Sequence, residues 1–569
     1  MKIGLVLLSI ALSKSLFAQD RYDVIIDELM ADPTPAVGLP AVEWVELKNK
    51  GPAAVNLQGW RLGDEAGLSG PFPAYMLPPD SFVIVCAASS LSQLATFGPA
   101  IAVGSFPSLA NEGELLYLRA GGKTMHALRY DLNWYGNELK KEGGWSLEMM
   151  DTRDPCTGAG NWKASTADPG GSPGKLNSVH AERPPPPPPA IINVYALDSS
   201  TLMVEFAGAV DSSTGASLAN YQLDGDLRLH QASMPGPLFD HAILRTDRPL
   251  TENRIYQLQT GGLSGCTGSR MPATEVIRTG RASEPGKEEW ILNEILFDPR
   301  PNAYDYVECL NTSPRILDAS RLFIGNRNSA GAVASIRPMS VKPRCIFPGD
   351  FIVLTEDAAS LALQYLVKNP DRVFEVTSLP SFPDDAGTVV LLNGRGEVTD
   401  ELKYDRDWHF ALVTDREGLS LERLNPRAPT QSASNWHSAG STAGYGTPTY
   451  SNSQFRRPDP IAATVAISPP CFSPDNDGQD DWASLQYKIT ESGWVANVQI
   501  LDGRGRPVRS LVRNALLGLE GSWVWNGLDD QGRKLPLGVY IVYTDLFNLQ
   551  GKTRQFKQSI VLARKLGQP

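Results

Sequence analysis

Apolar and polar residues alternate over short runs along most of this chain. Runs such as 81–86 and 388–392 have the period of two that is typical of β-strands. Turn-forming residues separate the runs, and the 51 glycines and 44 prolines fit many short strands better than long helices. Sustained helical spacing occurs at 358–367 alone. We therefore predict an all-β fold.

Two stretches of the chain are copies of one another. Several clusters recur at a constant offset of 274 residues, as 408 − 134 and 436 − 162 show. Such self-similarity indicates a duplicated domain. The clusters are Tyr130, Asp131 and Trp134 (again as Tyr404, Asp405 and Trp408), Ser146, Leu147 and Glu148 (again as Ser420, Leu421 and Glu422), and Asn161 with Trp162 (again as Asn435 with Trp436).

Each copy opens with a similar pair of strands. Residues 25–33 and 291–299 read as edge strands that end at proline, which cannot donate to a ladder. Alternating strands follow at 43–49 and 305–311. Short strands at regular spacing with turn signals between them indicate a β-sandwich. We expect four tandem immunoglobulin-like β-sandwich domains.

Composition divides the chain further. The run of six prolines at 184–189 predicts an extended, semi-rigid spacer. The predicted parts are a signal peptide (1–18), a first repeat (22–178), a proline-rich linker (179–189), a middle domain (190–280), a second repeat (288–455) and a terminal domain (463–566).

The N-terminus has the features of an export signal. A basic start at Lys2 precedes the apolar run 3–12, and the small residue Ala18 stands just before Gln19. This order predicts cleavage after Ala18. The apolar run is shorter than the roughly 20 residues that span a bilayer. We expect an exported protein of the cell surface or the extracellular medium, without a membrane span after cleavage.

Charge and cysteine content exclude some classes of protein. The net charge is −11 and the pI about 5.2, which argues against a general binder of nucleic acid or anionic membrane. No Cys-x-x-Cys pair occurs among the six cysteines, which disfavours zinc ribbons and thioredoxin chemistry. Disulfides Cys86–Cys156 and Cys309–Cys345, each within one repeat, are the pairings we consider.

The repeated motifs resemble the lamin-tail domain (LTD). The resemblance rests on the Glu28-to-Pro33 and Glu294-to-Pro299 openings, the Val45-Glu46 and Val307-Glu308 strands, and the Ser-Leu-Glu and Asn-Trp motifs. It covers about 22–178 and 288–455 and implies an immunoglobulin-like β-sandwich. Within it, His409 of the second repeat stands where the first has Tyr135, so any role of His409 is not shared.

The other two domains carry weaker resemblances. Residues 190–280 are similar to bacterial Ig-like domains of surface-layer proteins. Residues 463–566 resemble the Ig-like domain of flagellar hook-capping (FlgD-like) proteins and C-terminal surface modules, through 500–503, 523–527 and 535–540. In bacteria with type IX secretion, similar modules serve as sorting signals. The resemblance therefore implies that secretion machinery is one partner.

Catalytic motifs are absent from the sequence. None of the six histidines has metal-ligand spacing, and neither His-Glu-x-x-His nor Gly-x-Ser-x-Gly occurs. We expect no enzymatic activity and no catalytic or cofactor-binding residues. The repeated tryptophans are expected in sandwich cores, with a glycan-stacking platform as the alternative.

Residues 475–481 are the main candidate for a metal site. Asp475, Asp477 and Asp481 supply the oxygen ligands that Ca²⁺ prefers, and Gly478 permits a sharp turn. The Glu at the twelfth position of an EF-hand loop is missing. The alternative is a turn whose side chains cap backbone donors.

A second candidate is a set of acids that both repeats share. These acids bind a cation, or they cap turns and pair with Arg or Lys; we expect the second. The set is Glu28, Asp32, Glu43 and Glu46, with counterparts Glu294, Asp298, Asp305 and Glu308.

The sequence thus predicts a non-enzymatic scaffold or adhesion protein that binds an unknown protein or glycan. Two repeats on a stiff linker raise avidity for a repetitive target. The alternatives are a passenger or component of type IX secretion recognised through 463–569, and a hydrolase with an unrecognised site.

Overall fold

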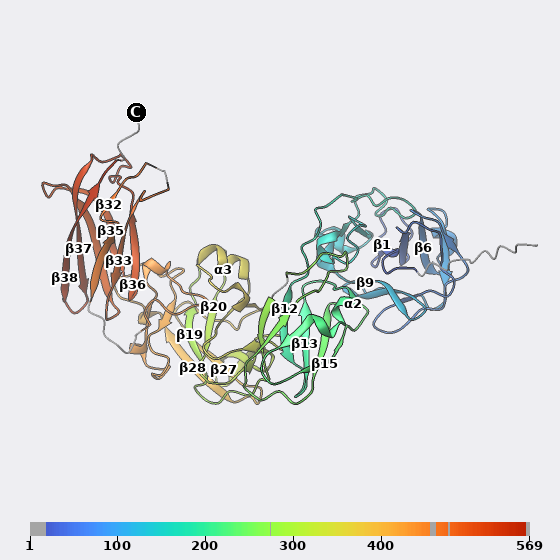
Figure 1. Cartoon of the computed structure of the whole chain (residues 1–569), viewed down its shortest axis with the longest axis horizontal. Helices are drawn as coiled ribbons and strands as arrows, with labels where there is room; N and C mark the ends of the chain where they lie inside the picture. Colours follow the sequence, from blue (N-terminus) through green and yellow to red (C-terminus); the bar gives the residue numbers. More distant parts are fainter. Residues whose placement is uncertain (1–18, 273–274, 456–462, 476–477, 565–569) are drawn as a thin grey trace, which may run out of the picture. The chain divides into compact units, whose positions relative to one another are not determined.

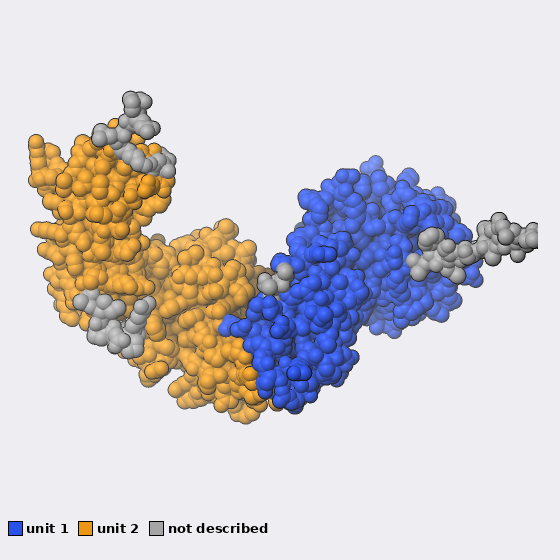
Figure 2. Space-filling model, viewed as in Figure 1, with its two compact units in different colours: residues 1–250, 256–279 blue, residues 251–255, 280–569 orange. Residues whose placement is uncertain are grey.

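The computed structural model describes residues 19–272, 275–455, 463–475 and 478–564. The predicted signal peptide, 1–18, therefore lies outside the described residues. The chain forms two compact units, shown in Figure 2: unit 1 comprises residues 1–250 and 256–279, and unit 2 comprises 251–255 and 280–569. Strands occupy 40% of the chain and helices 8%, which confirms the predicted all-β class. The boundaries of the predicted domains stay predictions.

In unit 1, the first repeat is built on a six-stranded sheet in the order β11-β10-β1-β2-β6-β7. A three-stranded sheet, β4-β8-β9, packs against it around one apolar core that includes Ile26, Val45 and Trp162. Its elements are β1 (Val24–Met30), β2 (Trp44–Asn49), β3 (Val55–Asn56), β4 (Arg61–Gly63), β5 (Met76–Leu77), β6 (Phe82–Ala87), α1 (Leu91–Leu94), β7 (Ala100–Val103), β8 (Gly113–Ala120), β9 (Lys123–Asp131), β10 (Leu147–Met149) and β11 (Trp162–Ala164).

The middle domain, also in unit 1, has a four-stranded sheet, β12-β13-β16-β15, and a three-stranded sheet, β14-β17-β18. Its separate core includes Val204, Leu244 and Leu258. Its elements are β12 (Ile191–Ala196), β13 (Thr201–Phe206), α2 (Ser212–Gly215), β14 (Tyr221–Leu223), β15 (Leu229–Ser233), β16 (His241–Thr246), β17 (Tyr256–Thr260) and β18 (Glu275–Thr279).

In unit 2, the second repeat reproduces the six-stranded sheet as β26-β25-β20-β19-β29-β30, and the sheet β23-β22-β27-β28 shares one apolar core with it. Figure 1 labels β19, β20, β27 and β28 of these two sheets. The helical spacing near 358 is realised as α3. The elements are β19 (Trp290–Leu296), β20 (Tyr306–Asn311), β21 (Leu317–Asp318), β22 (Phe323–Arg327), β23 (Val333–Pro338), β24 (Cys345–Ile346), β25 (Phe351–Thr355), α3 (Ala358–Gln364), β26 (Val373–Glu375), β27 (Ala386–Leu392), β28 (Val398–Asp405), β29 (Leu421–Arg423) and β30 (Trp436–Ser438).

The terminal domain pairs a three-stranded sheet, β31-β33-β36, with a five-stranded sheet, β32-β38-β37-β34-β35. Its elements are β31 (Thr464–Ser468), β32 (Cys471–Phe472), β33 (Ala483–Lys488), β34 (Trp494–Leu501), β35 (Pro507–Leu516), β36 (Glu520–Trp525), β37 (Gly538–Asn548) and β38 (Thr553–Leu562). Short 3-10 helices elsewhere in the chain are Leu132–Tyr135, Lys140–Glu142, Ala159–Asn161, Leu218–Asn220, Ala319–Arg321, Pro370–Arg372, Arg406–Trp408, Ala433–Asn435 and Ser441–Ala443.

The opening strands are not edge strands, which corrects the sequence prediction. β1 lies between β10 and β2, and β19 lies between β29 and β20. The pattern misled because β1 ends at Met30, before Pro33, so the proline removes no ladder donor. The partner strand β10 comes from more than 100 residues later, and local sequence does not reveal such a pairing.

The cysteine pairings also differ from those considered. Cys156 is bonded to Cys266 with a Cα–Cα distance of 6.5 Å, which joins the first repeat to the middle domain within unit 1. Cys86 and Cys309 are fully buried free thiols inside β6 and β20. Because Cys86 and Cys309 are buried inside their own strands, they do not reach Cys156 and Cys345, the partners that we considered from the sequence.

Candidate functional site

The six-stranded sheet of each repeat places three glutamates side by side in the protein interior. In the first repeat, Glu28 on β1 lies opposite Glu46 on β2 and opposite Glu148 on β10. In the second, Glu294 occupies the same place between Glu308 and Glu422. We call each set a glutamate triad. All six side chains are fully buried.

The triad of the first repeat holds the segment that ends the domain. We call residues 170–179 the first tail. The backbone N–H of Ser172 donates to Glu28, that of Gly174 to Glu46 and that of Val179 to Glu148. Hydrogen bonds to charged or polarised acceptors of this kind contribute more than neutral ones. The triad therefore holds a segment that has no regular secondary structure of its own.

The second repeat uses the same arrangement. We call residues 445–454 the second tail. The N–H of Thr447 donates to Glu294 at 2.9 Å, that of Thr449 to Glu308 at 2.6 Å and that of Gln454 to Glu422 at 2.8 Å. Each donor lies 275 positions after its counterpart in the first tail, as 447 − 172 and 454 − 179 show. The fastening is thus a feature of the repeat.

Side-chain hydroxyl groups also donate hydrogen bonds to the triads. Ser146 donates to Glu28 and Ser420 to Glu294, each at 2.6 Å. Tyr306 also donates to Glu294 at 2.6 Å. Burial raises the pKa of Glu28 and of Glu294 because a buried carboxylate loses its hydration, and neighbouring acids raise that of Glu28 further. These groups serve structure, because they face the tails instead of solvent.

The sequence grouped Glu28 and Glu46 with Asp32 and Glu43, and the structure separates these pairs. Asp32 accepts from its near neighbour Thr34, and Glu43 accepts from the N–H of Leu109. In the second repeat, Asp305 lies near Asp298, Asp384 and Glu356, and burial together with these acids raises the pKa of Asp305 to about 7. The capping contacts of Asp32 and Glu43 follow the alternative that we expected.

Sequence reasoning missed Glu148 and Glu422 as members of the triads. The motif that contains them, Ser-Leu-Glu, was used only to recognise the duplication and the LTD resemblance. Its repetition in both copies was the available signal, since a buried Ser and a buried Glu need hydrogen-bond partners.

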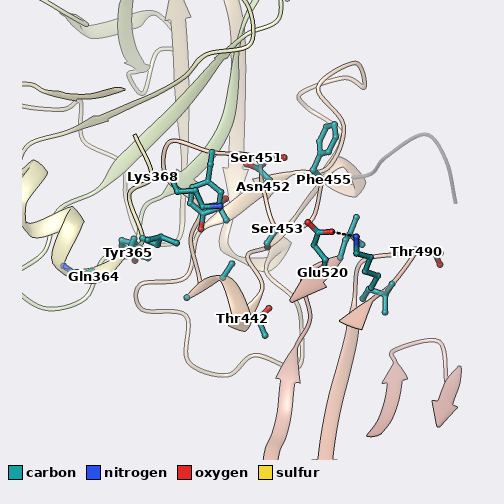
Figure 3. A pocket seen from close by; sticks show the side chains of 18 residues that line it. Gln364, Tyr365, Lys368, Thr442, Ser451, Asn452, Ser453, Phe455, Thr490 and Glu520 are labelled. Carbon is teal, nitrogen blue, oxygen red and sulfur yellow. Dashed lines mark ion pairs between the residues drawn. The ribbon is translucent and has the colours of Figure 1, made fainter. Parts of the chain in front are cut away.

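The outer face of the second tail forms one wall of a groove in unit 2, with a volume of about 870 Å³. Figure 3 shows its three sides: the end of α3 with Gln364 and Tyr365, the tail with Ser451 and Asn452, and the terminal domain with Glu520. This volume lies within the range of ligand sites in proteins.

Hydrogen bonds between the second repeat and the terminal domain fix the base of the groove. The N–H of Leu519 donates to the carbonyl of Ser453 at 2.7 Å, and the side-chain amide of Gln454 donates to the carbonyl of Leu517 at 2.9 Å. An apolar cluster of Phe410, Val495 and Leu516 lies across the same junction. The two domains are therefore joined by a packed contact within unit 2.

The groove lining is polar and aromatic with few charges. The Nζ of Lys368 lies 3.8 Å from the centre of the Tyr450 ring. Lys488 and Glu520 form an ion pair at 3.4 Å, marked by a dashed line in Figure 3. Glu520 is the one acid among the described residues that line the groove.

The predicted calcium loop is described in part. Asp477 lies outside the described residues. The carboxylate of Asp481 accepts from the N–H of Asp475 at 3.1 Å and of Gly478 at 2.8 Å. These contacts are those of a capped turn, and calcium binding by Asp475, Asp477 and Asp481 stays a prediction. Among the described residues, only Asp154, Cys156 and Cys266 bring three ligand atoms within 4.8 Å of one another, and both cysteines are in the disulfide.

His409 and the repeated tryptophans lie in cores. His409 is buried against Phe297, its Nδ1 shares a hydrogen bond with Ser438, and burial lowers its pKa to about 3. Trp162 and Trp436 are 2% and 3% exposed, which agrees with core packing and leaves no open ring face for a glycan.

One comparison with known families is decisive for the first repeat. Residues 18–131 match the lamin tail domain family. The LTD resemblance noted in the sequence is therefore shown for this part of the chain. The second repeat shares with the first repeat its sheet order, its glutamate triad and its fastened tail. No curated protein matches the chain by sequence.

Solved structures resemble the chain only distantly. The N-terminal part of the bacterial S-layer protein SbsC is 16% identical, with 38% of this chain and 43% of that chain covered and a TM-score of 0.16. A tetra-tandem repeat from the extending region of a large adhesion protein is 12% identical, with 95% and 98% covered and a TM-score of 0.12.

PorZ, a surface component of the type IX secretion system of Porphyromonas gingivalis, is 12% identical, with 80% of this chain and 69% of that chain covered and a TM-score of 0.15. The chain spans about half the length of the S-layer structures it matches. Similarity this low does not identify a function.

Proposed function

We propose that this protein is an exported, non-enzymatic scaffold of the cell surface or extracellular medium, and that the groove beside the second tail binds its partner. The export signal and the duplicated LTD-type repeat support the scaffold role. In the described part of the chain, no helix has the length and apolar character that crossing a membrane requires.

The observation that carries the proposal is the place of the acids. A hydrolase of the two-carboxylate type needs a pair of acids that face a substrate site. Here the triad carboxylates are buried under the tails, whereas Glu520, the one acid among the described residues that line the groove, is paired with Lys488. The triad acids of the second repeat thus hold the tail that forms one wall of the groove, and they do not line the groove themselves.

The lining favours a hydrated polar partner, and a glycan is the class that we propose. Tyr450 and Ser451 supply hydroxyl groups, Lys368 supplies an exposed ammonium group, and Tyr450 and Phe455 supply aromatic surface. Amphipathic aromatic side chains contribute both apolar contact and hydrogen bonds at such sites. Recognition of the terminal domain by type IX secretion machinery stays a prediction from the sequence resemblance.

The test is a screen of the mature chain, residues 19–569, against a glycan array and intact bacterial cells. Binding should weaken at least tenfold when Lys368→Ala and Tyr450→Ala are combined, which corresponds to about 1.4 kcal/mol. Arg395→Ala, in an exposed turn away from the groove, is the matched control and should bind as the wild type does.

Two results would refute the proposal. One is the absence of any wild-type binding to glycans or cells. The other is binding that the groove variant retains in full while its circular dichroism remains native. Binding to cells that survives enzymatic removal of surface glycans would instead identify a protein partner.

A further inference from the structure

The two repeats differ at one buried position beside the triad. Asp27 of the first repeat and Asn293 of the second both lie at a β-bulge, because the pairing register shifts between Ile26 and Glu28 and again between Leu292 and Glu294. A bulge re-aims the side chain of its extra residue. The same backbone feature therefore directs an acid in one repeat and an amide in the other.

In the second repeat, the amide of Asn293 fastens the tail. Its Nδ2 donates to Asn452 Oδ1 on the second tail and to Glu308 Oε1, each at 2.7 Å. Asn452 Nδ2 donates back to the backbone carbonyl of Asn293 at 3.0 Å. The two asparagines thus form a reciprocal pair in which every side-chain donor that joins them has an acceptor.

The first repeat keeps one of the two hydrogen bonds of this pair, and the other lacks a donor. Asn177 of the first tail, the counterpart of Asn452, donates to the backbone carbonyl of Asp27 at 3.0 Å. However, Asp27 Oδ1, Asn177 Oδ1 and Glu46 Oε1 are all buried without a hydrogen-bond partner. The counterparts of the last two atoms, Asn452 Oδ1 and Glu308 Oε1, accept hydrogen bonds from the Asn293 amide. An unsatisfied buried polar atom costs about 1–3 kcal/mol.

We propose that Asp27 is a neutral carboxylic acid in the folded first repeat, and that its proton makes the hydrogen bond to Asn177 Oδ1 that the Asn293 amide makes to Asn452 in the second. A protonated carboxyl group has one O–H donor, whereas an amide group has two N–H donors. Asp27 can therefore reproduce the contact with the tail asparagine, and not also the contact of Asn293 with Glu308. At this position, the contact that holds the first tail then depends on a proton, whereas the Asn293–Asn452 contact of the second tail does not titrate.

The alternative occupant, a metal ion, does not fit the described residues. No three ligand atoms of Asp27 and the triad acids lie within 4.8 Å of one another. A proton needs only one donor–acceptor contact, which the reciprocal pair supplies.

The charges around Asp27 agree with the neutral form. Lys48 on β2 favours the carboxylate, but its Nζ pairs with Asp80 at 3.3 Å. Glu148 on β10, Asp80, and the triad acids Glu28 and Glu46 all oppose a second negative charge. Burial, the largest cause, raises the pKa of Asp27 to about 7.

The sign of the pH dependence follows. The pKa of Asp27 is higher in the folded than in the unfolded state, so its contribution is fully present below the unfolded value and is lost as pH rises toward about 7. Alkaline conditions should therefore loosen the first tail, which holds Asn177 against Asp27.

The test is hydrogen exchange of the full chain at pH 5.5 and pH 8, read at residues 170–179 and corrected for intrinsic rates. The wild-type protection factor of the first tail should fall about 30-fold more between these pH values than that of Asp27→Asn. In Asn293→Asp, protection of residues 445–454 should become more dependent on pH in the same direction. At pH 6, the infrared band of a protonated carboxyl should weaken in Asp27→Asn.

The proposal is overturned if Asp27→Asn keeps the full pH dependence of the wild type. It is also overturned if Asp27→Asn lowers protection of the first tail at both pH values, or if the infrared band is unchanged. Should Asn293→Asp fail to fold at pH 8, refolding at pH 5.5 is expected, and failure at both values would count against the proposal.

Discussion

At the residue scale, the chain uses buried ionisable side chains as fasteners, and the two repeats use different ones at equivalent places. His126 of the first repeat accepts the N–H of Ile26 through Nδ1 and contacts the carbonyl of Pro155 through Nε2. The second repeat has Asp400 there, which accepts the N–H of Leu292. Either side chain accepts a hydrogen bond from a backbone N–H group of the opening strand. Both repeats thus satisfy the same buried donor, one with an imidazole and the other with a carboxyl group.

His126 predicts an acid sensitivity of the first repeat. Its Nδ1 can accept a hydrogen bond only when the ring is neutral, and burial lowers the pKa of His126 to about 4. A lowered histidine pKa contributes stability above the unfolded value of about 6.5 and loses it as pH falls toward 4. The free-energy difference between the wild type and His126→Gln should therefore shrink by up to about 1.4 kcal/mol per pH unit over that range.

Hydrogen exchange of β1 in the full chain measures this difference. His230→Gln, at an exposed position of the middle domain, is the control and should change nothing. A difference that stays constant or grows as the solution is acidified would contradict the assigned role of His126.

At the element scale, the sequence predicted strands well and their partners poorly. The run at 388–392 lies inside β27, and the helical spacing at 358–367 is realised as α3. Alternation reports which face of a strand is buried and is therefore visible locally. The position of β1 in the middle of its sheet was not visible, since it depends on pairing with β10 far along the chain.

The triads show the same difference between local features, which the sequence predicts, and strand pairing, which it does not. Glu28 and Glu46 were recognised as a repeated acid pair, because both lie in the opening strands. Glu148 was not assigned to them, because its strand joins β1 only in the folded sheet. The groove was beyond sequence reasoning altogether, as its walls come from α3, the second tail and the terminal domain.

At the scale of the whole molecule, the junction between neighbouring domains differs between the two units. Within unit 2, the contact is noncovalent and includes Phe410 and Leu516. Within unit 1, the disulfide Cys156–Cys266 closes a segment of 110 residues that contains the proline-rich linker. Export to an oxidising compartment, which the N-terminal signal predicts, is the condition under which such a bond persists.

The disulfide yields a prediction for the full chain. Cys266→Ser should lower the free energy of unfolding of unit 1 by about 2–4 kcal/mol, because the unfolded chain regains the freedom that the cross-link removes. Chemical denaturation followed by hydrogen exchange of β12 and β13 measures the change. Cys471→Ser removes an exposed free thiol and is expected to be silent. Equal effects of the two substitutions would refute the structural role of the disulfide.

The central claim is that buried glutamates hold the tails and thereby build the binding surface. Thr447→Val tests it most directly, since the Thr447 hydroxyl donates to Glu294 and lies 2.9 Å from Glu422, and valine keeps the shape without the donor. Hydrogen exchange of the full chain at pH 7 should show protection at 445–454 falling at least tenfold, which corresponds to about 1.4 kcal/mol or more, while β19 and β20 keep theirs. Thr414→Val, at an exposed loop position, should leave both unchanged. Unchanged protection of the second tail in Thr447→Val, or an equal loss across β19 and β20, would contradict the account.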